Sequence, residues 1–472
     1  MVVGAGIAGL SSALALGRAG HAVILLERDP LPTTGDVEEA FDADRRGAPQ
    51  VHQTHGFLAR LVVELRQHFP DVLQALRDVG CVTMPARNNL GDPQPGDEDL
   101  AVLIVRRTTL EWLLREAVLA EPNIEVRTGA GVSGLLPGPA AEPGGATAGI
   151  PSVGGVRLDD GTWLTADVVI DASGRRSPMP EWLYGMGVDV PETVHESGLM
   201  YLSRWYRIPP TLDVPMDAKL GGNLGYLKFL AVPGDARTLS ITLAIRTHDG
   251  ELRTALSDPV GFEQACRMLD GPSRYFAGGP LQPIGGVRPM TGLLNRVRRF
   301  VDGDGRPTVL GFHAVGDSHT CTNPLYGRGC SLALVQALTV AQEILAHPED
   351  PVARAVAVEA ANVRQIEPWF HSSVEMDIAG ADPGIEPGAP EREPSPMARV
   401  FVAAETDPVI GRALTKMMNL LSTPAELGAD AEFSARVAAI FADPGSYPVP
   451  PLEGPTRTEL LAAVLESCRQ TA

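Results

Sequence analysis

The chain begins with the stretch Met1-Val2-Val3-Gly4-Ala5-Gly6-Ile7-Ala8-Gly9, in which three glycines follow a short apolar segment in the pattern Gly-x-Gly-x-x-Gly. A helical pattern over 7–19 comes next, and an apolar run over 21–26 then ends at Glu27. Strand, turn, helix and strand in this order predict a βαβ unit whose turn can hold a pyrophosphate. The first glycine permits the tight turn, the second lets the backbone approach a phosphate, and the third lets the helix lie close to the strand.

Glu27 and the start of the predicted helix supply the contacts that such a turn needs. The acid follows Gly9 at close to the separation of about 20 residues at which a carboxylate binds the ribose hydroxyls of a dinucleotide. The helix begins with free backbone N–H groups and the positive end of its dipole, and both favour a pyrophosphate. Sites for NAD and for FAD share these features, so this segment alone leaves the nucleotide open.

A second glycine-rich segment lies late in the chain. The apolar stretch 309–315 predicts a buried strand, and Gly316 and Asp317 follow it. The segment Asn323-Pro324-Leu325-Tyr326-Gly327-Arg328-Gly329-Cys330 then leads into an apolar helix that we expect to reach Leu345. An acid after a strand can bind ribityl hydroxyls, and a helix N-terminus stabilises negative charge on a reduced flavin ring. The two glycine-rich segments together predict FAD as the cofactor.

The composition is that of a globular protein without a nucleic-acid partner. The 472 residues carry a formal net charge of -19, whereas binding to a phosphate backbone needs clustered Lys and Arg. The five cysteines include no Cys-x-x-Cys pair, which predicts free thiols of a reducing compartment and no metal site. We find no signal peptide and no run of the about 20 apolar residues that span a membrane, so we expect a cytoplasmic protein.

The order of the patterns predicts an α/β fold with a Rossmann-like, three-layer FAD-binding domain built on a parallel sheet. An inserted antiparallel sheet is expected because residues from about Glu192 to Val287 alternate in polarity and carry aromatic side chains. A mostly helical region follows the second glycine-rich segment. We therefore predict an FAD-binding domain over 1–190 and 288–345, an inserted substrate-binding sheet domain over 191–287, and a helical C-terminal region over 346–472.

Local patterns refine this organisation. Residues 29–47 are polar and predict a loop, and residues 57–79 predict a helix that is interrupted near its centre. Another helix opens at Arg106, and we expect Thr108 or Thr109 to cap it.

Two further segments are predicted to lack regular structure. A third glycine pattern, Gly129-x-Gly131-x-x-Gly134, is followed by Leu135-Leu136-Pro137-Gly138-Pro139, which predicts a turn between strands and no second dinucleotide site. The Pro-, Gly- and Glu-rich stretch 382–396 predicts an exposed loop.

Candidate substrate and catalytic residues rest on weaker patterns. The predicted inserted sheet carries four aromatic side chains that are candidates to line a substrate pocket, although each is equally compatible with a β-sheet core: Tyr201, Trp205, Tyr226 and Phe229. His55 and Tyr326 are candidates for a catalytic role beside the flavin, although a histidine of this kind is more often a hydrogen-bonded loop feature. Cys321 and Cys330 are predicted to pack beside the flavin without chemistry of their own.

Over roughly residues 1–345 the chain resembles the flavin-dependent monooxygenases of the para-hydroxybenzoate hydroxylase superfamily, and it looks most like the polyether-epoxidase and antibiotic-tailoring branch. The resemblance rests on five features: Gly4–Gly9 with Glu27, Gly47-Ala48-Pro49-Gln50 leading to His55, Arg107 before Leu110-Glu111-Trp112, Asp171–Ser177, and Gly316–Cys330. It implies that Glu27, Arg28 and Arg107 flank the adenosine part of FAD and that the backbone at Val132 meets adenine. It also implies a cofactor contact at Ser173, Asp317 on the ribityl chain, and the isoalloxazine ring along Pro324, Gly327, Arg328, Gly329 and Cys330.

The resemblance implies an FAD-dependent monooxygenase. Such an enzyme transfers one oxygen atom from a flavin hydroperoxide to an apolar or aromatic small molecule, by hydroxylation or epoxidation, and the branch implies secondary-metabolite or antibiotic biosynthesis. The reaction needs O2 and electrons from NADPH or NADH, received directly or through a separate flavin reductase. We expect a monomer or a homodimer.

One departure from the family pattern keeps two alternatives open. Many hydroxylases of this family carry an Asp-Gly pair after the strand that ends near Ile170, linked to both FAD and NAD(P)H binding, whereas this chain has Ser173-Gly174. That form is similar to flavin reductases of the geranylgeranyl-reductase type and to flavin halogenases. Halogenases of this kind need a lysine near the flavin, and the first 218 residues contain no lysine, which disfavours that alternative.

Overall fold

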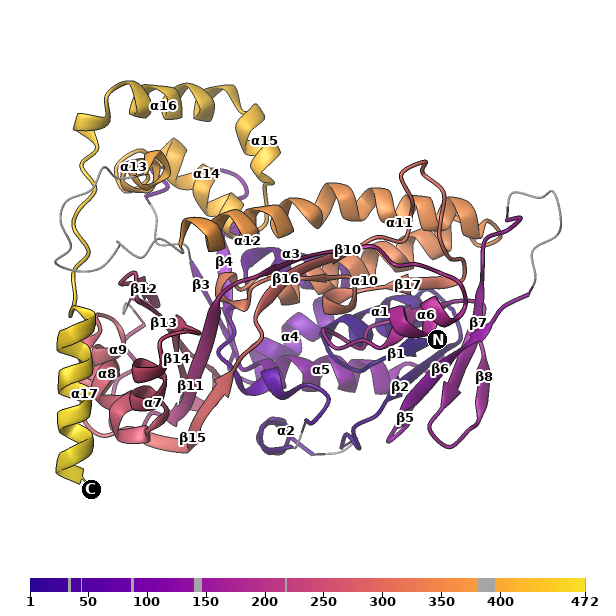
Figure 1. Ribbon diagram of the computed structural model, residues 1–472, viewed down its shortest axis with the longest axis horizontal. Helices are drawn as coiled ribbons and strands as arrows, with labels where there is room; N and C mark the ends of the chain where they lie inside the picture. Colours follow the sequence, from indigo (N-terminus) through magenta and orange to yellow (C-terminus); the bar gives the residue numbers. More distant parts are fainter. Residues whose placement is uncertain are drawn as a thin grey trace.

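The structure is a computed structural model that describes residues 1–32, 35–43, 45–85, 89–139, 147–216, 219–380 and 395–471. Its centre is a parallel sheet in the order β17-β9-β1-β2-β5, and Figure 1 shows this sheet beside the N-terminus. The strands are β1 (Val2–Val3), β2 (Val23–Glu27), β5 (Ile124–Thr128), β9 (Val169–Asp171) and β17 (Phe312–Ala314). The strands β1, β2 and β9 are short, apolar and largely buried, as expected for strands covered on both faces, whereas the edge strand β5 alternates in polarity and is only half-buried.

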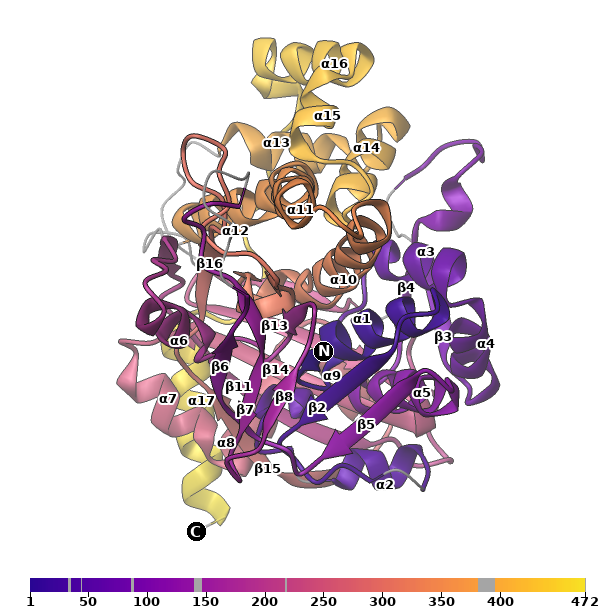
Figure 2. The ribbon, with the colours of Figure 1, turned by 90° about the vertical axis from the view of Figure 1, so that its right-hand side faces the viewer.

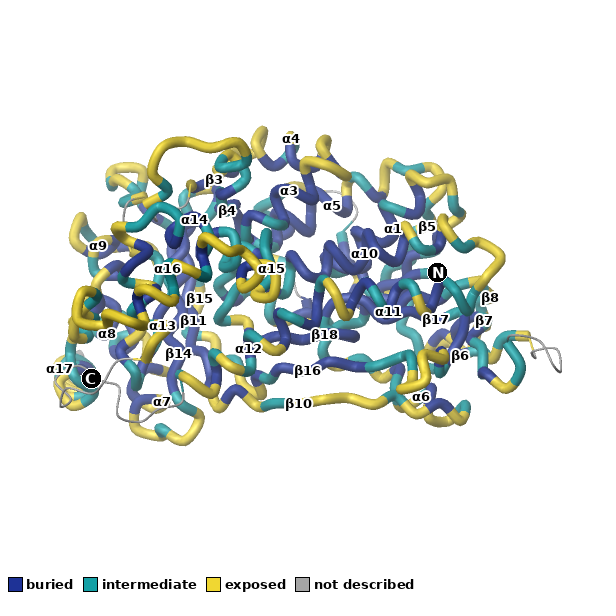
Figure 3. The backbone as a smooth tube through the Cα atoms, turned by 90° about the horizontal axis from the view of Figure 1, so that it is seen from above, coloured by how far each residue is buried: buried dark blue, intermediate teal, exposed yellow. Residues whose placement is uncertain are grey.

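Helices cover one face of this sheet. Val2, Leu25 and Ile170 point to this side and pack in one hydrophobic cluster with the helices. Figure 3 shows the buried backbone concentrated along these helices. They are α1 (Ile7–Arg18), α3 (Ala59–His68), α4 (Pro70–Asp78), α5 (Arg107–Ala120) and α10 (Gly329–Ala346).

An antiparallel meander covers the other face, so that this part of the chain has three layers. Side chains alternate along a strand, and therefore Val3, Leu26 and Val169 pack on this second side. The meander consists of β6 (Val132–Pro137), β7 (Val153–Leu158) and β8 (Trp163–Thr165), with α6 (Met179–Gly185) beside it (Figure 2). Residues 129–131 join β5 to β6 without a helix, as predicted, and Gly134 lies inside β6. The predicted α/β class with a parallel sheet, antiparallel sheets and a helical C-terminal region is confirmed.

A second, five-stranded antiparallel sheet has the order β12-β13-β14-β11-β15. Its strands are β11 (Leu199–Arg207), β12 (Gly221–Asn223), β13 (Leu227–Pro233), β14 (Thr238–Arg246) and β15 (Gln282–Met290). One face packs in a hydrophobic cluster with four helices. These are α7 (Gly250–Ser257), α8 (Pro259–Met268), α9 (Pro272–Ala277) and α17 (Arg457–Thr471). The alternating pattern predicted strands in this region and did not predict α7 to α9.

Smaller elements connect the two main sheets. Three strands form a further antiparallel sheet: β10 (Glu192–Glu196), β16 (Leu294–Arg298) and β18 (Thr320–Cys321). Two more strands pair with each other: β3 (Val82–Pro85) and β4 (Ala101–Ile104).

Two local predictions were wrong. Residues 37–42 form helix α2 (Val37–Asp42), which Asp36 caps through its side chain. Helix α5 has Arg106 as its N-cap residue, so that Thr108 and Thr109 lie inside the helix.

The C-terminal part is helical. Its helices before α17 are α11 (Pro351–Gln365), α12 (Glu367–Ala379), α13 (Pro396–Ala403), α14 (Pro408–Met418), α15 (Pro424–Ala429) and α16 (Ala431–Ala442). Helices α13 to α16 share their own hydrophobic cluster, and the chain then returns so that α17 lies along α8 (Figure 1). Most of the predicted loop 382–396 lies outside the described residues.

Among the described helices, α10 alone is long and apolar enough to cross a membrane by length and composition. Two thirds of it is buried in the fold, where it contacts α1, α3 and α11. Its apolar character is therefore that of a core helix.

Candidate functional site

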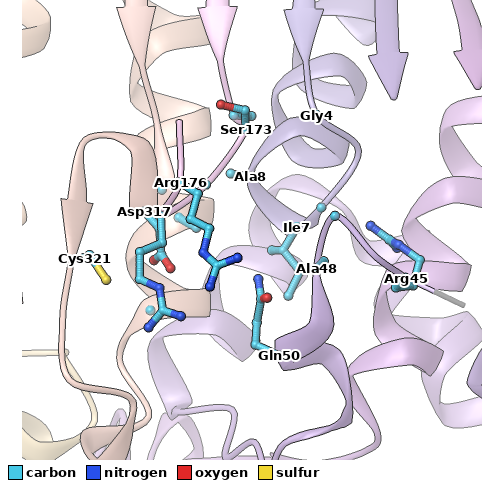
Figure 4. Close-up of a pocket in the computed structure, with 18 of the residues that line it drawn as sticks. Gly4, Ile7, Ala8, Arg45, Ala48, Gln50, Ser173, Arg176, Asp317 and Cys321 are labelled. Carbon is cyan, nitrogen blue, oxygen red and sulfur yellow. The ribbon is translucent and has the colours of Figure 1, made fainter. Parts of the chain in front are cut away.

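A cavity of about 280 Å³ runs along the carboxyl ends of β1, β2, β9 and β17 and joins the two glycine-rich segments. All of the predicted cofactor-binding residues except Gly9 and Arg328 line it. They are Gly4, Ala5, Gly6, Ile7, Ala8, Glu27, Arg28, Arg107, Val132, Ser173, Gly316, Asp317, Pro324, Gly327, Gly329 and Cys330. Figure 4 shows the side chains of Gln50, Arg176 and Asp317 converging from different segments on the space beside Ile7. The fold thus brings residues that are far apart in the sequence to one elongated space.

The first turn packs as its three glycines require. Gly4 has a φ of +102°, and a Cβ on it would come within 2.5 Å of the carbonyl oxygen of Ala172. A Cβ on Gly9 would overlap the carbonyl oxygen of Gly4, which explains why Gly9 supports the turn without lining the cavity. A Cβ on Gly6 would instead clash with no protein atom, because its nearest neighbours, on Glu111 and Arg107, lie at van der Waals distances of 3.9 Å and 4.0 Å. The missing side chain of Gly6 therefore leaves room for a ligand at the N-terminus of α1.

Glu27 is tied to the turn at the end of β2. One of its carboxylate oxygens accepts a hydrogen bond from the Ala5 backbone N–H at 2.8 Å, and the other accepts one from the Asp29 N–H at 2.9 Å. Asp29 in turn accepts from the Gly47 N–H at 2.9 Å. Glu27 thus connects the glycine-rich turn to the segment that carries Gly47, and it lines the cavity at this end.

Arg107 is held from two sides at the start of α5. Its Nε donates to Glu111 at 2.8 Å, and its Nη1 lies 3.2 Å from Nε2 of His55. Nδ1 of His55 lies 2.9 Å from the carbonyl oxygen of Gln53. Burial, and next the positive charge of Arg107, lower the pKa of His55 to about 3, so the ring is neutral at pH 7. A neutral ring that donates from Nδ1 to Gln53 accepts at Nε2 from Arg107, and His55 thereby orients the guanidinium.

Ser173 and Asp317 follow neighbouring parallel strands. Asp171, at the end of β9, accepts from the N–H and Oγ of Ser173 at 2.9 and 2.6 Å and from Oγ of Ser177 at 2.6 Å. Burial raises the pKa of Asp171 and also that of Asp317. Arg107 is the strongest of the arginines that oppose the shift at Asp317. Asp171 therefore shapes the turn after β9, whereas the Asp317 side chain faces the cavity (Figure 4).

The cavity is rich in arginine. Its lining contains two acids, Glu27 and Asp317, against six arginines: Arg28, Arg45, Arg46, Arg107, Arg175 and Arg176. Arg45 is buried and paired with Glu111 at 2.9 Å, whereas Arg46 and Arg176 are exposed. This balance suits a ligand with several negative charges. Four of these arginines were not predicted from the sequence: Arg45, Arg46, Arg175 and Arg176. They form two adjacent pairs, each near a quoted motif, and this pairing is the sequence feature that could have indicated them.

Of the four aromatic residues predicted to line a substrate pocket, Tyr201 lines this cavity, and Trp205, Tyr226 and Phe229 do not. Tyr201 lines the cavity together with Gln53 and with Met290 of β15. Phe229 points to the opposite face of the sheet and is buried in the cluster beneath α7 to α9, where Tyr226 also packs. Trp205 is on the same face as Tyr201, but its ring packs against Phe41, and its Nε1 donates to the His52 carbonyl oxygen.

The remaining candidate residues differ in whether they line the cavity. His55 lines the cavity, whereas the Tyr326 hydroxyl donates to Asp377 on α12 and Tyr326 is not among the lining residues. Arg328 points away from the cavity and bonds to α12. Burial raises the pKa of the Cys330 thiol to about 11 and raises that of Cys321 further, so both thiols stay protonated at neutral pH.

These features fit FAD. The opening beside Gly6 and the N-terminus of α1 offer a place for the pyrophosphate, and Arg107 provides positive charge next to it. Glu27, which ends β2, and Val132 line the cavity, as do Asp317 and Pro324 of the late glycine-rich segment. The cavity therefore has the elongated shape and the donor set that the long cofactor needs.

Comparisons with known proteins agree with this description. Residues 1–81 match the family described as FAD dependent oxidoreductase. Comparison of the sequence with curated proteins finds no match. Among solved structures, PqsL of Pseudomonas aeruginosa, described as a probable FAD-dependent monooxygenase, is similar with a TM-score of 0.59 and 16% identity, covering 81% of this chain and 96% of its own.

Two further solved structures are similar over more of the chain. A flavoprotein/dehydrogenase of Cytophaga hutchinsonii has a TM-score of 0.62 and 13% identity, with 94% of this chain and 98% of its own covered. The flavin-dependent brominase Bmp2 has a TM-score of 0.58 and 14% identity, with the same coverage. The family match and the shared fold support an FAD-dependent oxidoreductase.

Proposed function

We propose that this protein is an FAD-dependent monooxygenase that transfers one oxygen atom to an apolar or aromatic small molecule, by hydroxylation or epoxidation. The observation that carries the proposal is the continuous cavity that leads from the pyrophosphate turn at Gly6 to Tyr201 and Met290 of the antiparallel sheet. A cofactor that spans this cavity would have its ring end beside a wall that a substrate can share. PqsL, which has a similar fold, has been crystallised with 2-aminobenzoylacetate.

Each part of the site has a separate task in this proposal. The N-terminus of α1 would bind the pyrophosphate, Glu27, Arg28, Arg107 and Val132 the adenosine part, and Asp317 the ribityl chain. Bound FAD supplies the activation of O2. The sheet and the loop after Asn323 orient the substrate and exclude water, which strengthens the electrostatic interactions inside the site.

Two features of the site bear on which donor supplies electrons to the flavin. The exposed arginines Arg46 and Arg176 at the cavity would favour the negatively charged NADPH or NADH as a direct donor. The Ser173-Gly174 turn, in place of the Asp-Gly pair, favours delivery through a separate flavin reductase. The same turn supports a second candidate function, a flavin-dependent reductase of the geranylgeranyl-reductase type, in which hydride moves without oxygen.

A halogenase is a third candidate, which the likeness to the brominase Bmp2 favours. Within the part of the chain that the structure describes, the residues that line the cavity include no lysine. The proposal therefore ranks halogenation below oxygenation.

The proposed biological role is based on the sequence resemblance. We propose a role in secondary-metabolite or antibiotic biosynthesis, with the polyether-epoxidase branch as the nearest relative. All five cysteines are free thiols, which supports a reducing, cytoplasmic environment. We keep a monomer or a homodimer as the proposed assembly, and the FAD-binding, sheet and helical segments as the proposed domains.

Flavin content and electron transfer test the proposal. Purified protein is expected to be yellow and to release FAD on denaturation, and a colourless protein that takes up no FAD would contradict it. Stopped-flow reduction by NADPH and NADH, with and without candidate aromatic substrates, separates direct reduction from use of a partner reductase. Turnover under ¹⁸O2 then distinguishes the candidates: label in the product supports a monooxygenase, unlabelled reduced product supports the reductase, and halide-dependent halogenated product supports the halogenase.

A further inference from the structure

Three hydrogen-bond donors converge on Asp377, a buried carboxylate on α12 that is 4% exposed. Oδ1 accepts from Nδ2 of Asn323 and from the hydroxyl of Tyr326, each at 2.7 Å. Oδ2 accepts from Nδ2 of Asn295 at 2.7 Å. Asn323 and Tyr326 belong to the loop at the ring end of the cavity, so a helix outside the region of family resemblance reaches this loop directly.

The orientation of both amides is determined by other contacts. Oδ1 of Asn323 accepts from the backbone N–H of Leu325 at 3.1 Å, and Oδ1 of Asn295 accepts from the backbone N–H of Asn323 at 2.8 Å. A backbone N–H can only donate, so the NH2 group of each amide must point to Asp377. Burial and Asp377 raise the pKa of Tyr326, which keeps its hydroxyl protonated as the third donor. Both oxygens of Asp377 therefore act as acceptors, as expected of an ionised carboxylate.

These bonds determine the shape of the loop. Asn323 caps the short 3-10 helix η5 (Pro324–Tyr326), and its Oδ1 also accepts from the hydroxyl of Tyr201 at 2.6 Å. Gly327 then turns the chain with a φ of +67°. Pro324 and Gly327 line the cavity, and Tyr201 lines it from the antiparallel sheet. Asp377 thus stands behind the point where the loop, the sheet and the cavity meet.

Arg328 fastens the other end of the loop to the same helix. Its Nη1 donates to the Trp369 carbonyl oxygen at 3.0 Å and to Oγ of Ser373 at 2.7 Å, and its Nη2 donates to Oγ of Ser372 at 3.1 Å. The guanidinium also lies over the rings of Tyr326 and Trp369, at 5.1 and 5.4 Å from their centroids. Helix α12 therefore holds the loop on both sides of Gly327.

We propose that Asp377 is a positioning residue for the flavin ring: through Asn323 and Tyr326 it holds the loop 323–327 in the conformation that receives the cofactor. This inference rests on the proposed function, because it takes FAD to be the ligand of the loop. It assigns to the C-terminal helical region a direct part in the site. Loss of the carboxylate should alter the loop and the bound flavin, and not only the stability of the fold.

The first test compares Asp377→Asn with Glu375→Gln. Asparagine keeps the shape but presents an NH2 group to one of the three donors, whereas Glu375 is an exposed carboxylate on the same helix. In Asp377→Asn one of the three buried donors loses its acceptor, so the loop that receives FAD is held less firmly. We expect FAD binding to be weaker by about tenfold or more. We also expect a shifted visible absorption band and a more positive midpoint potential, because a negative charge behind the ring is lost. Glu375→Gln should bind FAD with the wild-type affinity, spectrum and potential.

The second test works without cofactor and with a milder variant. Hydrogen–deuterium exchange of the apo protein should show faster exchange in 323–327 for Asp377→Asn and for Tyr326→Phe, with unchanged exchange in α1. In FAD affinity the two substitutions should be non-additive, because they remove the same contact. Wild-type exchange in the loop of Asp377→Asn, or strict additivity, overturns the inference. Absence of FAD from the wild-type protein overturns the proposed function instead, which the exchange experiment does not depend on.

Discussion

Arg106 and Asp235 form a buried ion pair that joins the nucleotide-binding part to the antiparallel sheet. The Arg106 guanidinium donates from Nε to both oxygens of Asp235 at 3.1 Å and from Nη2 to Oδ2 at 2.8 Å, and its backbone N–H donates to Oδ1 at 2.8 Å. Arg106 directly precedes Arg107, which lines the cavity. The pair therefore fixes the sheet relative to the first turn of α5.

The turn that carries Asp235 is itself constrained. Ala236 and Arg237 have φ values of 51° and 55°, in the left-handed region that residues with a Cβ rarely adopt. Arg237 compensates by donating to the carbonyl oxygens of Ile208 at 3.1 Å and Pro209 at 2.9 Å. The position of the sheet beside the cavity thus depends on contacts on both sides of this turn.

We predict that Asp235→Ala destabilises the protein by about 3 kcal/mol, because the buried Arg106 charge loses its buried partner and keeps the half-exposed Glu38, at 2.6 Å, as its remaining carboxylate. Urea denaturation followed by fluorescence measures the change. Asp213→Ala, at an exposed carboxylate of the same sheet region, should have little effect. The double variant Arg106→Met/Asp235→Leu should recover most of the loss, and a cost for Asp235→Ala below about 1 kcal/mol would contradict the role of the pair.

Substitutions at two glycines of the first turn should separate cofactor binding from folding. Gly6→Ala keeps an allowed backbone, with a φ of -83°, and places a methyl group in the cavity. We expect apo stability close to that of the wild type and an FAD affinity reduced by at least about tenfold. Gly9→Ala should lower the melting temperature of the apo protein itself, because its Cβ overlaps the Gly4 carbonyl oxygen. Differential scanning fluorimetry and FAD titration check both, and equal apo melting temperatures for the two variants would refute the distinction.

The two faces of the antiparallel sheet should respond differently to truncation. Phe229→Ala removes a side chain from the cluster beneath α7 to α9 and should cost about 3–5 kcal/mol of stability without changing the affinity for FAD. Met290→Ala, at the cavity, should cost less stability and alter the spectrum of bound FAD. Denaturation and FAD titration of both variants provide the measurement. A loss of FAD affinity in folded Phe229→Ala would show that the assignment of the faces is wrong.

Acid should destabilise the protein partly through His313 on β17. Burial, and next Arg354, lower the pKa of His313 to about 3, against an ordinary value of 6.5. Between these values the unfolded chain binds the proton and the folded protein does not, so stability is full above about pH 6.5 and falls toward pH 3. The slope for one such group is about 1.4 kcal/mol per pH unit. Urea denaturation of wild type and His313→Leu from pH 7.5 to 4.5 should show a shallower decline in the variant; parallel curves would exclude this contribution.

Much of the cavity lining could be predicted because its residues lie in contiguous stretches. The order of Gly4, Gly6, Gly9 and Glu27 reflects local geometry, in which a strand, a tight turn and a helix dipole act within one βαβ unit. Asp317 could also be predicted, since an acid directly after a buried parallel strand must lie at the carboxyl edge of the sheet. Arg328 was misplaced because sequence position alone does not tell which way a side chain at a helix start points.

The residues of the antiparallel sheet that line the cavity were harder to predict from the sequence. Aromatic residues in an alternating segment can face either side of a sheet, and a shift of one residue reverses the face. Tyr201 and Phe229 belong to opposite faces by their pairing with Ala244 and Leu243 on β14, a register that only the folded sheet defines. Helices α7 to α9 then bury one face.

The parallel fold, the glycine-rich turn and most of the residues that line the cavity could be predicted from the sequence, because they follow from short-range constraints on backbone and helix dipole. The contacts of Asp377 on α12 with the loop at Asn323, and of Arg106 with Asp235, could not be predicted in this way. Such contacts join residues that are distant in the chain, and their partners are selected by packing and by the cost of burying an unpaired charge, neither of which leaves a pattern in a single segment.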